Sequence, residues 1–93
     1  MTIEVNKTAK SRLNSTSLQN LGFGEVFSDH MFTMDYSDGK WHSPRIVPFA
    51  DIPLSPALSS LHYGQIVFEG LKAFPDNKGG INIFRPQKYH ERM

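Results

Sequence analysis

Three charged side chains in the second half of the sequence are candidates for chemistry: Glu69, Lys72 and Arg92. A carboxylate such as Glu69 can act as a general acid or base, and the amine of Lys72 can form a Schiff base with a carbonyl. The planar guanidinium of Arg92 suits bidentate binding of an anion. Each residue could instead be a solvent-exposed charge without a chemical role, because isolated charges on the surface are common.

Aromatic side chains form a second group of candidates. Phe27, Tyr63 and Phe68 could line an apolar pocket, since burial contributes roughly 0.8 kcal/mol per methylene without any hydrogen bond. The ordinary alternative is that they pack in the core. Four histidines lack both i, i+4 pairing and carboxylates at metal spacing, so we expect no metal site. They are His30, His42, His62 and His90.

The first half of the sequence predicts a polar arm and then a hairpin. Residues 1–20 are rich in Ser, Thr and Asn and predict a flexible arm. Residues 26–36 are aromatic and β-prone and predict a strand, and Asp38-Gly39 predicts a tight turn into a returning strand that starts at Trp41. Several prolines then predict an extended connection over residues 43–58, with at most an edge strand.

Residues 60–70 form the best helix candidate. Apolar side chains recur along one stripe of this segment. Ser59 or Ser60 can cap its N-terminus, and Gly70 is placed to end it in the left-handed conformation. We therefore predict a helix that carries Tyr63, Phe68 and Glu69.

A second hairpin and a second helix are predicted further on. Residues 71–74 and 81–84 read as short strands around a turn rich in Gly and polar residues. Pro86 suits the first position of a helix. Because that helix reaches Met93 without an end signal, we expect the natural polypeptide to continue.

Length and composition limit the remaining possibilities. A chain of 93 residues forms one small domain at most, and its formal charge of +1 offers no broad field for nucleic acid. It has no cysteine, no apolar run long enough to cross a membrane and no secretory leader, so we expect a soluble, cytoplasmic protein. Residues 7–18 have some features of a mitochondrial presequence, but Glu4 and the missing amphipathic stripe argue against one.

Three blocks of the sequence resemble the branched-chain amino acid aminotransferases, which are pyridoxal-phosphate enzymes of fold type IV. The blocks are Phe27-Ser-Asp-His-Met31, then Leu61-His-Tyr-Gly-Gln-Ile-Val-Phe-Glu-Gly-Leu-Lys-Ala-Phe74, and then Ile83-Phe-Arg-Pro86 leading to Arg92-Met93. The resemblance runs from about Gly22 to the end of the sequence. One departure is Tyr89, where the family commonly has Asn.

The resemblance implies an α+β fold: a small antiparallel sheet with one or two packed helices, as in the N-terminal small domain of a fold-type IV enzyme. Residues 1–20 would be the arm and residues 21–93 the small domain. The whole enzyme would be a homodimer that binds pyridoxal 5'-phosphate and transfers the amino group of leucine, isoleucine or valine to 2-oxoglutarate. We also expect no partner in a membrane or among nucleic acids, because the net charge is only +1 and no apolar run is long enough to cross a bilayer.

The resemblance also assigns roles to individual residues. Arg92 matches the arginine that binds the cofactor phosphate, and Tyr63 and Phe68 match positions that line the substrate pocket, with Phe27 facing the same pocket. Glu69 is interpreted as structural, in an ion pair or a cap. The Schiff-base lysine of the family would lie beyond Met93. Lys72 does not match it, so we assign no catalytic residue and expect the isolated chain to be inactive.

Two alternatives stay open at this point. Another enzyme of the same fold, a D-amino acid aminotransferase or an aminodeoxychorismate lyase, would share the central helix motif. A non-catalytic small domain could instead bind a partner through its exposed aromatic side chains.

Overall fold

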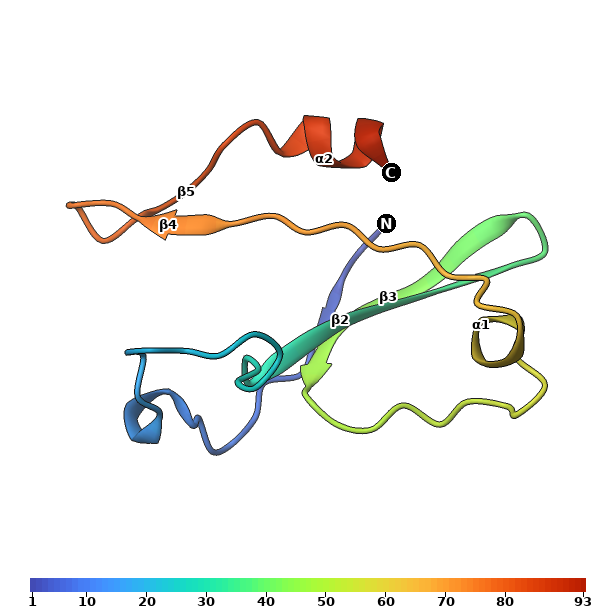
Figure 1. The fold of residues 1–93 in the computed structure, drawn as a ribbon, viewed down its shortest axis with the longest axis horizontal. Helices are drawn as coiled ribbons and strands as arrows, with labels where there is room; N and C mark the ends of the chain where they lie inside the picture. Colours follow the sequence, from blue (N-terminus) through green and yellow to red (C-terminus); the bar gives the residue numbers. More distant parts are fainter. The chain divides into compact units, whose positions relative to one another are not determined.

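The computed structural model describes residues 1–93 and divides into two compact units, Met1–Ile52 and Pro53–Met93. It combines short helices with two small sheets, which confirms the α+β class. The predicted division into an arm and a small domain stays a prediction. The elements in chain order are β1 (Glu4–Val5), η1 (Leu13–Ser15), β2 (His30–Ser37), β3 (Lys40–Pro48), α1 (Ser59–His62), β4 (Ala73–Pro75), β5 (Ile81–Ile83) and α2 (Pro86–Arg92) (Figure 1).

The hairpin of β2 and β3 dominates the first unit. Its strands are antiparallel, and Ser37 lies opposite Lys40 across a two-residue turn. Asp38 and Gly39 in that turn have φ values of 50° and 76°, the left-handed conformation that an Asp-Gly pair supplies. The predicted turn and hairpin are thus confirmed.

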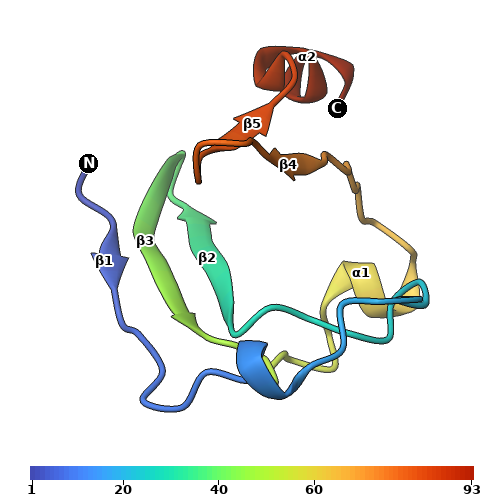
Figure 2. The same ribbon diagram turned by 90° about the vertical axis from the view of Figure 1, so that its left-hand side faces the viewer.

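The β3 strand is longer and more central than the sequence predicted. It continues to Pro48 and lies between β1 and β2 (Figure 2), whereas we expected an extended connection from residue 43 with at most an edge strand. A bulge explains the difference, because the register shifts between Thr33 and Asp35 and Ser43 takes a φ of 51°. Pro44 lies within this irregularity, where its missing N–H removes no ladder hydrogen bond.

The N-terminal residues pair with the hairpin through β1. Glu4 and Val5 lie parallel to Arg45 and Ile46 of β3, and the N–H of Asn6 donates to the carbonyl of Ile46 at 2.9 Å. These bonds give the polar arm the neighbouring surface that its composition requires.

The first helix of the second unit is much shorter than predicted. The α1 helix covers Ser59–His62 only, and the prediction of a helix over residues 60–70 is wrong. Gly64 has a φ of 62°, so the chain leaves the helical conformation one turn after the start, and Gly70 is not its end. Tyr63 closes the turn by donating its N–H to the carbonyl of Ser59 at 2.8 Å.

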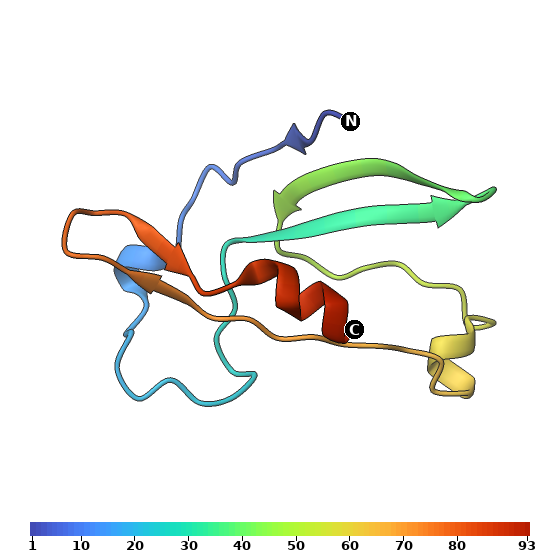
Figure 3. The same cartoon turned by 90° about the horizontal axis from the view of Figure 1, so that it is seen from above.

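The second hairpin and the last helix are confirmed. Residues of β4 and β5 pair antiparallel, with Phe74 opposite Asn82. The carboxylate of Asp76 closes their turn by accepting the N–H groups of Lys78 and Gly80 at 2.8 and 2.7 Å. Pro86 is the first residue of α2, as its missing N–H and fixed φ favour. Figure 3 shows this hairpin leading into α2.

Neither unit contains a buried hydrophobic core. No hydrophobic side chain is fully buried, and Phe68 and Tyr63 are 93% and 87% exposed. None of the helices has the length and apolar character needed to cross a membrane. Because apolar burial is the main favourable term in folding, the local hairpins and turns have little to stabilise them together.

We therefore expect the isolated chain to unfold without a sharp, cooperative thermal transition. Circular dichroism and calorimetry of a monomeric sample should show a broad, weakly endothermic change. A narrow transition whose calorimetric and van't Hoff enthalpies agree would contradict this expectation.

Candidate functional site

An ion pair between Arg92 and Glu69 connects α2 to the segment before β4 in the second unit. The Nε–H of Arg92 donates to Oε2 of Glu69 at 2.7 Å, and its Nη2–H donates to Oε1. The N–H of Gly70 also donates to this carboxylate, at 2.8 Å. The Glu69 side chain is 14% exposed and that of Arg92 is 67% exposed, so the guanidinium reaches from α2 to a largely covered carboxylate. The predicted structural role of Glu69 in an ion pair is confirmed.

Both partners of the pair are fully charged near neutral pH. The hydrogen bond from Arg92, followed by that from the Gly70 N–H, lowers the pKa of Glu69 to about 2. The hydrogen bond to Glu69 and its charge raise the pKa of Arg92 above the ordinary value. A carboxylate with so low a pKa is a poor proton acceptor, which argues against Glu69 as a general base.

Tyr89 supports the same guanidinium from within α2. The Arg92 guanidinium carbon lies 5.7 Å from the centre of the Tyr89 ring, within the range of a cation–π contact. The sequence marked Tyr89 only as a departure from the family pattern, and its contact with Arg92 was missed. A Tyr three residues before an Arg on a helix is the signal that could have indicated it.

The end of the Arg92 fork that points away from Glu69 makes no hydrogen bond to the protein. A guanidinium carries five N–H donors, and Glu69 engages it along one side, through Nε and Nη2. The opposite edge, formed by Nη1 and the second Nη2–H, can donate two hydrogen bonds to an anion. The exposed fork therefore fits a phosphate ester.

A pocket adjoins this pair in the second unit. Tyr89 lines it and also lies under Arg92. Its wall is mostly apolar, and Lys72 contributes to it. The lining residues are Gly70, Leu71, Lys72, Phe74, Phe84 and Tyr89.

The predicted substrate residues are not gathered into one pocket within either unit. Phe68 directly precedes Glu69, so the Arg92–Glu69 pair fixes the backbone next to it. Tyr63 lies just after α1 and is exposed. Phe27 belongs to the first unit, where its ring stacks on Phe49 with centroids 5.0 Å apart. The roles of these residues stay predictions.

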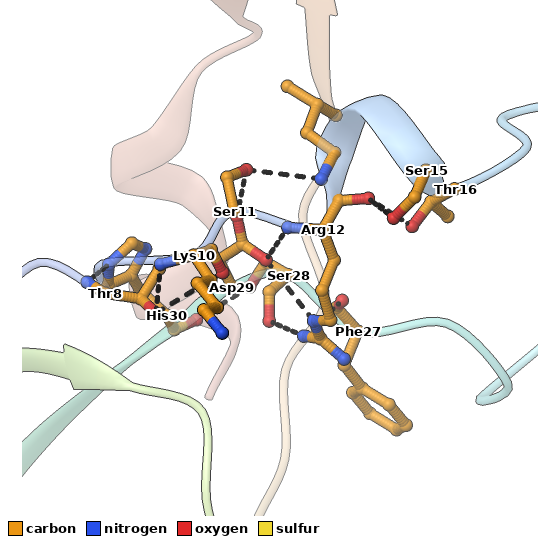
Figure 4. Close-up of polar contacts among 11 residues, drawn as sticks. Thr8, Lys10, Ser11, Arg12, Ser15, Thr16, Phe27, Ser28, Asp29 and His30 are labelled. Atoms are coloured by element: carbon orange, nitrogen blue, oxygen red, sulfur yellow. Dashed lines mark hydrogen bonds and ion pairs between the residues drawn. The ribbon is translucent and has the colours of Figure 1, made fainter.

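A polar cluster around Asp29 ties the N-terminal arm to the start of β2 (Figure 4). Ser11 Oγ donates to Asp29 at 2.6 Å, and the backbone N–H of Arg12 donates to it at 3.0 Å. The Arg12 guanidinium donates to the carbonyls of Phe27 and Ser28 at 3.2 and 2.9 Å. Local sequence patterns do not indicate this cluster, because its partners lie fifteen or more residues apart in the chain.

The arm contacts depend on the charge of Asp29. Hydrogen bonds from Ser11 and from the Arg12 backbone are the main reasons that the pKa of Asp29 lies below its ordinary value of 3.8. A carboxylate with a lowered pKa in the folded state stabilises that state above 3.8, and this contribution is lost as the pH falls through the lowered pKa.

Asp29→Asn removes the negative charge at neutral pH, as protonation of Asp29 does in acid. The substitution should therefore loosen the contacts of the arm. We expect the Thr8 and Arg12 amides, which donate to His30 and Asp29, to exchange with solvent about two- to fivefold faster than in the unmodified chain at the same pH. Asp51→Asn, at an exposed aspartate outside the cluster, is the matched control. Equal exchange in all three proteins would show that Asp29 does not hold the arm.

No protein-family model matches the chain. Comparison with curated proteins, however, finds relatives that are aminotransferases. Branched-chain-amino-acid transaminase 1 of Bacillus subtilis (strain 168) is 51% identical over 74 residues, or 78% of this chain. Branched-chain-amino-acid aminotransferase 2 of the same organism is 44% identical over 92 residues, or 98% of this chain. A probable branched-chain-amino-acid aminotransferase of Streptomyces coelicolor is 46% identical over 77 residues.

The chain spans about a quarter or less of the length of these relatives, 21% and 24% for the two Bacillus proteins. Identity at this level over most of the chain shows that it is homologous to part of an aminotransferase. More narrowly, the relatives are branched-chain-amino-acid aminotransferases, so the family recognised from the sequence motifs is confirmed.

Proposed function

We propose that this chain forms part of the active site of a pyridoxal-phosphate-dependent branched-chain aminotransferase. The whole enzyme would transfer the amino group of leucine, isoleucine or valine to 2-oxoglutarate. The 51% identity with a branched-chain-amino-acid transaminase carries this proposal. It also favours this reaction over the D-amino acid aminotransferase and lyase alternatives, because the relatives found carry the branched-chain name.

Arg92 would bind the cofactor phosphate in this enzyme. Its outward edge is free of protein acceptors, and the side chain is 67% exposed, as an anion-binding group must be before its ligand arrives. When bound, pyridoxal phosphate supplies the carbonyl that bonds the amino group and the ring that withdraws electrons from the substrate. Arg92 would hold the phosphate end in place while this happens.

Phe68, Tyr63 and Phe27 would form the apolar wall that receives the substrate side chain. Their present exposure, 93%, 87% and 52%, leaves these rings available for such a contact. An aromatic wall selects aliphatic side chains by excluding water from them.

Proton transfer would fall to a lysine outside residues 1–93. Glu69 is engaged by Arg92 and has a pKa of about 2, which suits an ion pair and not a base. Lys72 lies in an exposed segment before β4 and does not match the family's lysine. The same proposal includes a homodimeric enzyme in the cytoplasm. It also includes the division of this chain into an arm (1–20) and a small domain (21–93).

A chimeric enzyme tests this function. In it, the present chain replaces the matched segment of the Bacillus subtilis transaminase 1. We expect the chimeric enzyme to transaminate leucine with 2-oxoglutarate and to leave D-alanine unchanged. The isolated chain, given excess cofactor, should show no turnover. Preference for D-alanine would favour the alternative enzyme class, and turnover by the isolated chain that disappears in Lys72→Ala would contradict the absence of a catalytic lysine.

A further inference from the structure

We propose that Glu69 is a positioning residue that orients Arg92 for the phosphate of the cofactor. This inference rests on the proposed function, because it concerns the group that Arg92 binds there. Glu69 itself would not touch the cofactor. Its role would be to hold one side of the guanidinium so that the opposite edge faces the anion.

The geometry of the pair supports this division of the fork. Glu69 accepts from Nε and Nη2 of Arg92, which together form the lateral edge of the guanidinium. The terminal edge, with Nη1, makes no hydrogen bond to the protein. A second bidentate acceptor can therefore bind Arg92 while Glu69 stays in place.

Two further contacts restrict the Arg92–Glu69 pair, one at the carboxylate and one at the guanidinium. The N–H of Gly70 donates to Oε1 of Glu69 at 2.8 Å, which fixes the carboxylate relative to its own backbone. The Tyr89 ring supports the Arg92 guanidinium from α2 at 5.7 Å. The guanidinium of a long, flexible arginine is thus held by Glu69 and by the Tyr89 ring before any anion arrives, which reduces the ordering cost of binding.

The negative charge of Glu69, taken alone, would weaken phosphate binding by Arg92, whereas positioning of the guanidinium would strengthen it. A carboxylate beside the guanidinium partly cancels the field that attracts phosphate, so a purely electrostatic effect predicts tighter phosphate binding when Glu69 is neutralised. Positioning predicts weaker binding instead. The sign of the change therefore separates the two effects.

The test measures cofactor affinity in the chimeric enzyme after the cofactor has been removed. Pyridoxal 5'-phosphate and pyridoxal, which lacks the phosphate, are each titrated by absorbance. We expect Glu69→Gln to weaken binding of the phosphate ester about five- to tenfold, the factor expected for one side chain that is no longer held in place. Binding of pyridoxal should be unchanged. Glu69→Asp, which keeps the charge but shortens the reach, should show a similar loss.

Two controls show whether Glu69 acts through Arg92. Glu91→Gln removes an exposed carboxylate that pairs with Lys88 on α2, so it should leave both affinities unchanged. In an Arg92→Ala background, Glu69→Gln should cause no further loss.

Three results would overturn the proposal. Unchanged or tighter phosphate-ester binding in Glu69→Gln would do so, as would a loss that persists in the Arg92→Ala background or that affects pyridoxal equally. All three results leave the phosphate role of Arg92 standing if Arg92→Ala alone weakens binding. If Arg92→Ala has no effect, the phosphate role and this proposal fail together.

Discussion

Arg92→Ala in the chimeric enzyme is expected to weaken binding of pyridoxal 5'-phosphate roughly ten- to hundredfold. A charge-assisted hydrogen-bond contact to phosphate contributes about 1.5 to 3 kcal/mol, and each 1.36 kcal/mol corresponds to a factor of ten. The preference for leucine over alanine should hardly change, because the guanidinium lies at the phosphate end of the cofactor in this account. Titration of the cofactor-free protein measures the affinity directly.

Lys88→Ala is the control for Arg92→Ala. Lys88 is a cation on the same helix and pairs with Glu91 at 2.6 Å, so its removal lowers the positive charge of α2 without touching the Arg92–Glu69 pair. We expect its cofactor affinity to equal that of the unmodified enzyme. If Arg92→Ala also retains full affinity, the phosphate role is assigned to the wrong residue.

Phe68→Ala is expected to change substrate choice and not cofactor binding. Loss of the aromatic wall should lower kcat/KM for leucine and isoleucine about tenfold relative to alanine, since one or two methylenes at roughly 0.8 kcal/mol each would lose their contact. The cofactor absorbance should stay nearly intact. Steady-state kinetics with the three amino acids measures the ratio.

Phe23→Ala is the matched control for Phe68→Ala, because Phe23 is also fully exposed and has no assigned role. Its leucine-to-alanine ratio should match that of the unmodified enzyme. A Phe68→Ala protein that loses its cofactor but keeps the ratio would reverse the roles proposed for the two ends of the site.

Local signals in the sequence predicted the turns better than the elements between them. Asp38-Gly39 predicted its hairpin because two successive positive φ values are accessible to few other residue pairs. Pro86 predicted the first turn of α2 for a similar reason, since its ring fixes φ and its missing N–H is not needed there. Both signals depend on backbone geometry over a few residues and need no distant partner.

The failed predictions involve interactions that such local rules do not contain. The helix predicted over 60–70 matched an apolar stripe, yet the chain turns at Gly64 and β-branched Ile66 and Val67 follow. Periodicity indicates a helix only when something packs against the stripe, and both Ile66 and Val67 are 74% exposed here. Pro44 was expected to exclude a central strand, but the bulge at Ser43 accommodates it.

The candidate site shows the same contrast. The sequence predicted a structural role for Glu69, in an ion pair or a cap, and the structure identifies Arg92 as its ion-pair partner, 23 residues further along the chain. It did not indicate that Tyr89 would support Arg92, or that Asp29 would bind the arm. Such contacts depend on where separate segments meet in space, which residue types and spacing do not specify.

The central claim is that Arg92 binds the cofactor phosphate with Glu69 at its side. A crystal structure of the chimeric enzyme with pyridoxal 5'-phosphate tests it most directly. We expect the terminal edge of Arg92 to donate to phosphate oxygens at about 2.7 to 2.9 Å while Nε keeps its bond to Glu69. A phosphate held entirely by other residues, with Arg92 directed into solvent, would contradict the account.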